Sequence, residues 1–148
     1  VAKVHANGQG GLLDIALGDH QVSNYQANVE ARTIGAKAIA PLVYDGRWPG
    51  VDYQWGIDSI ASYPYDGSAI GYWDSGPLRS DPLNPGEFIG TDPPAVTSLP
   101  NSTGVDPHED PRRAVSDQLM VSGFLKVGGR INDTCGVDPC YANGFTGP

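Results

Sequence analysis

Residues 2–17, AKVHANGQGGLLDIAL, have the pattern of a β-hairpin. Residues 2–6 alternate apolar and polar side chains, as a strand with one buried face does. The next five residues, NGQGG, supply the turn. Residues 12–17 return as an apolar run, which Gly18 and Asp19 end. The chain is therefore expected to begin with two antiparallel strands.

The segment that follows is ambiguous between strand and helix. Residues 21–30 alternate weakly, which favours a strand. Residues 29–39 would instead place Ala31, Ile34, Ala38 and Ile39 on one side of a short helix, which Pro41 would end. We favour the strand.

The overall composition predicts one domain rich in turns. Gly and Pro supply 33 of the 148 residues, nearly double their usual share of roughly 12%. The hydrophobic fraction is 39% and the charged fraction only 18%. We expect a mainly β, loop-rich fold resembling a sandwich or a barrel, with few long helices.

The charge pattern excludes several classes of partner. The net charge is −8, with nine basic residues in total, so the chain lacks the basic surface that nucleic acids and anionic membranes require. No run approaches the roughly 18 apolar residues of a membrane span. Val1 fits a cleaved signal, a removed initiator Met or proteolytic processing.

Two cysteines enclose a four-residue turn. Cys135 and Cys140 flank Gly-Val-Asp-Pro, which suits a local disulfide better than a zinc site, because no second pair exists. A disulfide indicates an oxidising compartment. Two triplets of the glycosylation type, at Asn101 and Asn132, favour the same location. We expect an extracellular or virion-surface protein.

Most aromatic residues gather in one segment, residues 44–73. Trp and Tyr rings can stack on sugars or fill pockets of a partner protein, or they can form the core of a β domain. Tyr-Asp-Gly occurs twice in the segment, at 44–46 and 65–67, and predicts two similar turns. The candidate binding residues are Tyr44, Trp48, Tyr53, Trp55, Tyr65, Tyr72 and Trp73.

The chain divides into three parts by composition. Residues 1–76 form a β-rich core with aromatic loops. Residues 77–110 form a Pro-rich extended arm, which regular structure cannot easily accommodate. Residues 111–148 contain a short helix near 111–126 and the disulfide loop, packed on the same domain. Asp110 is expected to cap the helix, with Pro111 at its first position and an apolar face of Val115, Leu119 and Met120.

Catalytic motifs are scarce. Gly8 and Gly10 begin a dinucleotide fingerprint that Leu13 breaks. Asp106, His108, Glu109 and Asp110 could ligate a metal, but adjacent side chains rarely converge on one ion. Ser-His-Asp catalysis stays open, because its groups converge only in space. Carboxylates among the aromatics (Asp52, Asp58, Asp66 and Asp74) leave glycoside hydrolysis open as well.

The sequence therefore predicts a protein without catalytic function, cofactor or metal. Its leading interpretation is a structural or interaction subunit of an extracellular or virion-surface assembly, which contacts other protein subunits through the arm and the aromatic loops. One alternative is a carbohydrate-binding module with a Trp/Tyr platform. Another is an accessory subunit of a larger secreted enzyme.

Overall fold

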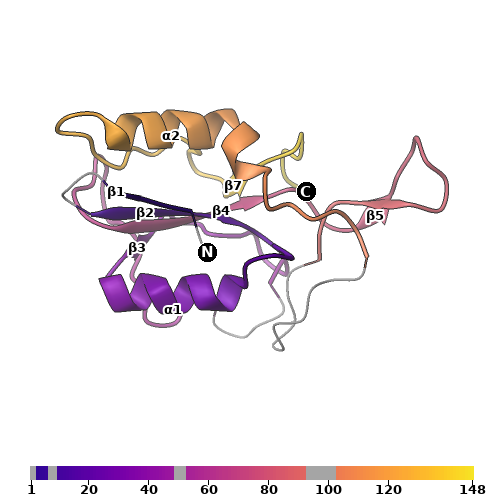
Figure 1. Cartoon of the computed structure of the whole chain (residues 1–148), viewed down its shortest axis with the longest axis horizontal. Coiled ribbons are helices and arrows are strands. Elements are labelled where there is room, and N and C mark those ends of the chain that lie inside the picture. Colours follow the sequence, from indigo (N-terminus) through magenta and orange to yellow (C-terminus); the bar gives the residue numbers. More distant parts are fainter. Residues whose placement is uncertain (1–2, 7–9, 49–52, 93–102) are drawn as a thin grey trace.

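The computed structural model describes residues 3–6, 10–48, 53–92 and 103–148. In this part of the chain an open sheet lies between two helices, one on each face (Figure 1). The strand order is β1-β2-β4-β3, with β7 also paired to β4. The sheet strands are β1 (Lys3–Ala6), β2 (Gly11–Ala16), β3 (Lys37–Ala38), β4 (Ala69–Asp74) and β7 (Cys140–Tyr141).

The predicted hairpin is confirmed, but most of the sheet is parallel. Strands β1 and β2 are antiparallel, from the pair Lys3–Asp14 to the pair Ala6–Gly11. Strands β2, β3 and β7 each pair with β4 in the parallel direction. The fold contains the predicted hairpin and many loops, but it mixes helices with small sheets and is only loosely the mainly β fold predicted. Because the sheet is open and covered by helices, the sandwich or barrel prediction is wrong. Parallel strands need crossover segments, which cover both faces of a sheet.

Strand β4 is the centre of the sheet and contributes to a core on each face. All six of its residues are buried. Ile70 and Tyr72 belong to the cluster that contains Ala27 and Ala31 of the first helix. Ala69 and Trp73 alternate with them and join the cluster around Met120 and Phe124 of the last helix. A strand buried on both faces shows no polar alternation, so its sequence AIGYWD gives no clear strand signal.

Helix α1 (Asn24–Ile34) occupies the segment for which we favoured a strand, and that prediction is wrong. Its buried residues are Asn24, Ala27, Asn28 and Ala31, at helical spacing. Two of the four are asparagines, so the apolar periodicity is weak. Gly35 ends the helix in the left-handed conformation, and its N–H bonds to the carbonyls of Ala31 and Arg32.

The C-terminal helix is confirmed, with changes at its start and on its face. A 3₁₀ turn, η1 (Pro111–Arg113), precedes helix α2 (Val115–Leu125). Asp110 makes no side-chain cap. Met120 is buried as expected, but Val115 and Leu119 are 68% and 60% exposed. Helix α2 instead turns Asp117, Met120, Gly123 and Phe124 toward the sheet.

The first part of the Pro-rich segment forms a hairpin that projects from the body (Figure 1). Strands β5 (Arg79–Ser80) and β6 (Phe88–Ile89) form its short antiparallel ladder. Prolines 93, 94 and 100 lie outside the described residues. No helix in the described part is long and apolar enough to cross a membrane.

Candidate active site

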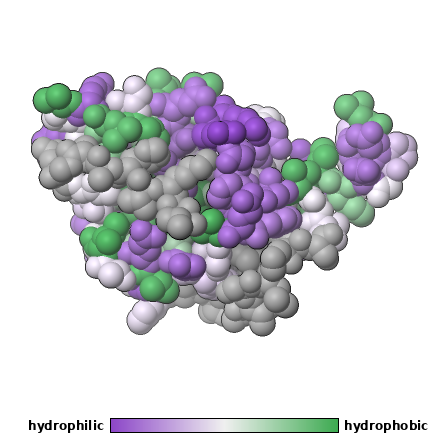
Figure 2. All heavy atoms as spheres, viewed as in Figure 1, coloured by the Kyte–Doolittle hydropathy of each residue, from purple (hydrophilic) through white to green (hydrophobic). Residues whose placement is uncertain are grey.

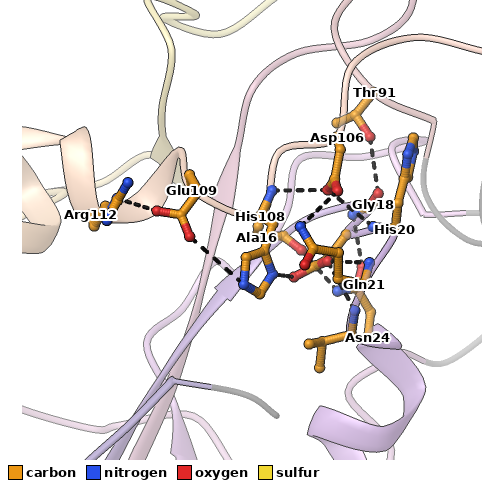
Figure 3. Close-up of polar contacts among 12 residues, drawn as sticks. Ala16, Gly18, His20, Gln21, Asn24, Thr91, Asp106, His108, Glu109 and Arg112 are labelled. Atoms are coloured by element: carbon orange, nitrogen blue, oxygen red, sulfur yellow. Dashed lines mark hydrogen bonds and ion pairs between the residues drawn. The ribbon is translucent and has the colours of Figure 1, made fainter.

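Two loops meet at the edge of the sheet where the parallel strands β2 and β4 end. Parallel strands end at the same edge, and in open α/β sheets this carboxyl edge is where ligands bind. The chain leaves β2 through residues 17–22, here named the acid loop. Residues 103–110, here named the base loop, return from the projecting hairpin to η1. The two loops meet in Figure 3.

The acid loop is shaped by Gly18 and by the first residue of α1. The Gly18 N–H donates to Oδ1 of Asn24 (2.8 Å), and Nδ2 of Asn24 donates to the Ala16 carbonyl (2.8 Å). Gly18 has a φ of +80°, and a Cβ there would lie 2.1 Å from Oγ1 of Thr91. A tight turn with positive φ and no room for a side chain requires glycine. Asn24 and Gly18 together fix where the next residue, Asp19, points.

The Asp19 carboxylate is oriented by backbone donors. Its Oδ1 accepts the N–H groups of Gln21 (2.7 Å) and Val22 (2.9 Å). This leaves Oδ2 to accept a hydrogen bond from another side chain. The carboxylate is 7% exposed, so water competes little for that position.

His108 of the base loop fills that position. Its Nδ1 lies 2.7 Å from Oδ2 of Asp19, and the imidazole is 20% exposed. A carboxylate accepts only, so in the neutral imidazole Nδ1 carries the proton and Nε2 presents its lone pair. Nε2 lies 3.9 Å from Oε1 of Glu109. Among the described residues no hydroxyl or thiol bonds to Nε2.

The base loop is held by contacts to three other segments. Asp106 accepts hydrogen bonds from the acid loop and from its own loop, as Figure 3 shows. The Ser75 hydroxyl, directly after β4, donates to Oδ2 of Asp110 (2.5 Å). Glu109 pairs with Arg112 of η1. Among the described residues, no group of three or more histidine, cysteine or acidic side chains could hold a metal ion.

Partial burial alone would raise the pKa of Asp106. The hydrogen bonds from Gln21 and from the N–H groups of His108 and His20, with the nearby His20 ring, outweigh burial and lower that pKa. Asp106 is therefore a carboxylate at neutral pH.

A second charged pair closes the same edge beside β4. The Arg47 guanidinium donates to both carboxylate oxygens of Asp74, at 2.8 and 2.9 Å. It also donates to the carbonyls of Gly76 (2.8 Å) and Thr91 (2.6 Å). Its side chain is 5% exposed and that of Asp74 is 1% exposed. This ion pair fastens the loop after β4 to the base of the projecting hairpin.

The structure does not gather the predicted aromatic residues into one platform. Trp48 and Tyr72 are buried in the core on the α1 side and Trp73 in the core on the α2 side. Tyr53 packs against Trp48 (5.6 Å between ring centroids), and Tyr44 and Tyr65 are half-buried. Only Trp55 among the seven is largely exposed, at 67%. These seven residues therefore do not form one exposed Trp/Tyr platform.

The predicted disulfide is confirmed. Cys135 and Cys140 are bonded, and Cys140 opens strand β7. Asn132 of the second glycosylation triplet is exposed. Asn101 of the first lies outside the described residues.

Sequence reasoning missed the pairing of Asp19 with His108. The two residues are 89 positions apart, and neither stands in a motif that marks it. His108 was considered only as a metal ligand beside its sequence neighbours. Recognising the pair from sequence would have required both the parallel pairing of β2 with β4 and the Ser75–Asp110 bond, which holds the base loop beside the end of β4.

Comparison with known protein families, with characterised proteins and with solved structures yields no match.

Proposed function

We propose that this chain carries the acid and the base of a hydrolytic acyl-transfer site, with Asp19 orienting His108. The single observation that carries the proposal is the 2.7 Å contact between Oδ2 of Asp19 and Nδ1 of His108 at the carboxyl edge of a parallel sheet. The proposal departs from the non-catalytic function that the composition favours.

The chemistry follows from the tautomer that Asp19 selects. Neutral His108 would take the proton of an attacking O–H group at Nε2 while the oxygen bonds to the substrate carbonyl carbon. The imidazolium, stabilised by Asp19, would then give that proton to the leaving group. The nucleophile is water or a hydroxyl group from outside the described residues, because both cysteines are joined in the disulfide.

Two further features support an ester or related acyl compound as the substrate class. The pair lies on loops beside the ends of adjacent parallel strands, where α/β hydrolases hold their acid and base. The acid precedes the base in the chain, as in those enzymes, but residues 1–18 contain no serine, so the order matches for the acid and the base alone. This support is an analogy of geometry and order.

The test is hydrolysis of p-nitrophenyl acetate by the purified chain, followed by nitrophenolate release. We expect a rate above that of equimolar free imidazole, and a loss of roughly 10²-fold or down to background in His108→Gln. Asp19→Asn should lose most of the rate, because the amide no longer selects the Nδ1–H tautomer.

His5→Gln is the matched control. His5 pairs with Leu12, at the opposite end of β2 from the acid loop, so its loss should leave the rate unchanged. Equal rates in the wild-type chain and His108→Gln would contradict the proposal.

A second candidate function is subunit contact through the projecting hairpin, within an extracellular or virion-surface assembly. The observation that favours it is the exposure of Leu83 (85%) and Phe88 (47%) on a segment that stands clear of the body. Figure 2 shows apolar and hydrophilic residues side by side on this projection. Such a segment can reach a neighbouring protein while the core stays intact. The disulfide is compatible with the oxidising compartment that this function implies.

Light scattering tests this candidate. The hairpin can be removed by deleting residues 78–89, because Thr91 N–H already bonds to the Gly76 carbonyl (2.8 Å) across its base. An assembly that falls to monomer on deletion, and also in Leu83→Ser/Phe88→Ser, would support subunit contact. A monomer in every form would exclude it as a contact between copies of this chain.

A further inference from the structure

Asp106 joins the two loops that carry the acid and the base. Its Oδ1 accepts the backbone N–H of His108 (3.1 Å) and of His20 (3.3 Å). Its Oδ2 accepts from Nε2 of Gln21 (3.0 Å). One carboxylate thus bonds to the residue that follows Asp19, to the residue after that, and to the backbone of the proposed base (Figure 3).

We infer that Asp106 is a positioning residue, which holds the His108 ring against the Asp19 carboxylate. The inference rests on the function proposed for that pair. Asp106 does not touch the imidazole, so it takes no part in proton transfer. It acts by fixing the distance between two loops that are otherwise tied to different elements, the acid loop to β2 and α1 and the base loop to β4 and η1.

Asp106 is the acceptor in all three hydrogen bonds, which explains why a carboxylate occupies this position. Three N–H donors converge on Asp106, and an anion with two acceptor oxygens satisfies all of them. An apolar replacement would leave the donors to water and free the base loop from the acid loop. The Asp19–His108 contact would then depend on the Ser75–Asp110 bond and on η1 alone.

Asp81 offers a matched control. Its Oδ1 accepts the N–H of Leu83 (2.8 Å), two residues on, and its Oδ2 accepts from the Asn84 amide (2.7 Å). Asp106 makes the same local turn with His108, but Asp81 lies on the projecting hairpin, away from both loops. Loss of either carboxylate removes an equivalent turn, and only loss of Asp106 separates acid from base.

The experiment is ¹⁵N NMR of the intact chain with labelled histidine, because the nitrogen shifts report which tautomer is present. The wild-type His108 should be mostly in the Nδ1–H form, with its Nδ1 proton protected from exchange. In Asp106→Ala we expect the ratio of the Nε2–H to the Nδ1–H form to rise about fivefold or more, with loss of that protection. Asp81→Ala should leave the ratio unchanged.

Two further variants keep the inference testable if Asp106→Ala does not fold. Asp106→Asn should retain most of the wild-type ratio, because Oδ1 still accepts from the backbone and the Gln21 amide can turn to accept from the new Nδ2. Adding Gln21→Ala removes that compensation and should shift the ratio toward the Asp106→Ala value.

The outcomes separate the inference from the proposed function. A wild-type chain in which His108 lacks the protected Nδ1–H form contradicts the function. A wild-type signature that persists in folded Asp106→Ala, or in the double variant, overturns the positioning role and leaves the Asp19–His108 pair intact.

Discussion

Two pairs of charged or titratable side chains lie at the same edge of the sheet, and they differ in burial and in how many of their hydrogen-bonding groups have partners. Arg47 and Asp74 are almost completely buried, and the guanidinium donates hydrogen bonds to one carboxylate and two carbonyls. Asp19 and His108 are more exposed, and one imidazole nitrogen has no hydroxyl or thiol partner among the described residues. A guanidinium keeps its proton and its charge near neutral pH, whereas an imidazole can gain or lose a proton there. The first pair therefore stabilises the fold, and the second has the groups that the proposed proton transfer requires.

The largest expected effect breaks the first pair. Arg47→Ala leaves the Asp74 carboxylate buried without its cation, and removing one partner of a buried ion pair costs about 3–5 kcal/mol. Urea unfolding of the two chains measures the difference. Arg79→Ala is the control, since Arg79 is exposed on the hairpin and its loss should cost no more than about 0.5 kcal/mol. Similar values for the two variants would show that Arg47–Asp74 is not a structural clamp.

The next effect separates backbone strain from steric contact beneath the second pair. Gly18→Ala introduces both a strained positive φ and a Cβ 2.8 Å from the Asp92 carbonyl, and should cost about 2–4 kcal/mol. Gly46 has nearly the same φ, +81°, with nothing within 4 Å of its Cβ, so Gly46→Ala should cost only about 1 kcal/mol. Thermal unfolding of both variants compares them, and equal losses would mean that the acid loop yields to the added methyl group.

The parts of the fold that could be predicted from the sequence are those with local signals. The first hairpin and the C-terminal helix follow from local signals, an NGQGG turn in one case and Pro111 before an apolar run in the other. Helix α1 could not be recognised, because its buried face contains Asn24 and Asn28. Their amides bond to Ala16 and Tyr53, partners that exist only in the folded protein.

The candidate site could be predicted from the sequence even less well than helix α1. A predicted sandwich or barrel contains no shared carboxyl edge, so nothing placed residue 19 beside residue 108. The sequence instead favours the tryptophans as binding candidates, because their rings suit both binding and burial. Both Trp48 and Trp73 are buried. Trp73 lies on the central strand, which is covered on both faces and needs large apolar side chains, and Trp48 packs against Tyr72 of the same strand.

A smaller effect on stability tests the second pair directly. His108→Gln removes one hydrogen bond from a partly exposed side chain, and should cost about 1 kcal/mol in urea unfolding. The same change should abolish hydrolysis of the nitrophenyl ester. Arg47→Ala should lower the free energy of unfolding several times more than His108→Gln does. A His108→Gln variant as unstable as Arg47→Ala would make the imidazole a structural group like the guanidinium.

The smallest effect concerns Tyr63, whose buried hydroxyl has no hydrogen-bond partner among the described residues. Burial, with a smaller contribution from Asp133, raises the pKa of Tyr63 to about 12. The folded chain therefore holds the phenolic proton more tightly than the unfolded chain, whose tyrosine ionises near pH 10. The resulting contribution to stability is complete below about pH 10 and is lost as the pH rises toward 12.

Tyr63→Phe isolates that contribution. At pH 7 the substitution should change the free energy of unfolding by no more than about 0.5 kcal/mol, because no described residue bonds to the lost hydroxyl. Between pH 10 and 12 the Phe variant should lose less stability than the wild-type chain, as measured by denaturant unfolding at each pH. Parallel curves for the two chains would mean that water reaches the hydroxyl. A large loss at pH 7 would mean that it bonds to a group beyond the described residues.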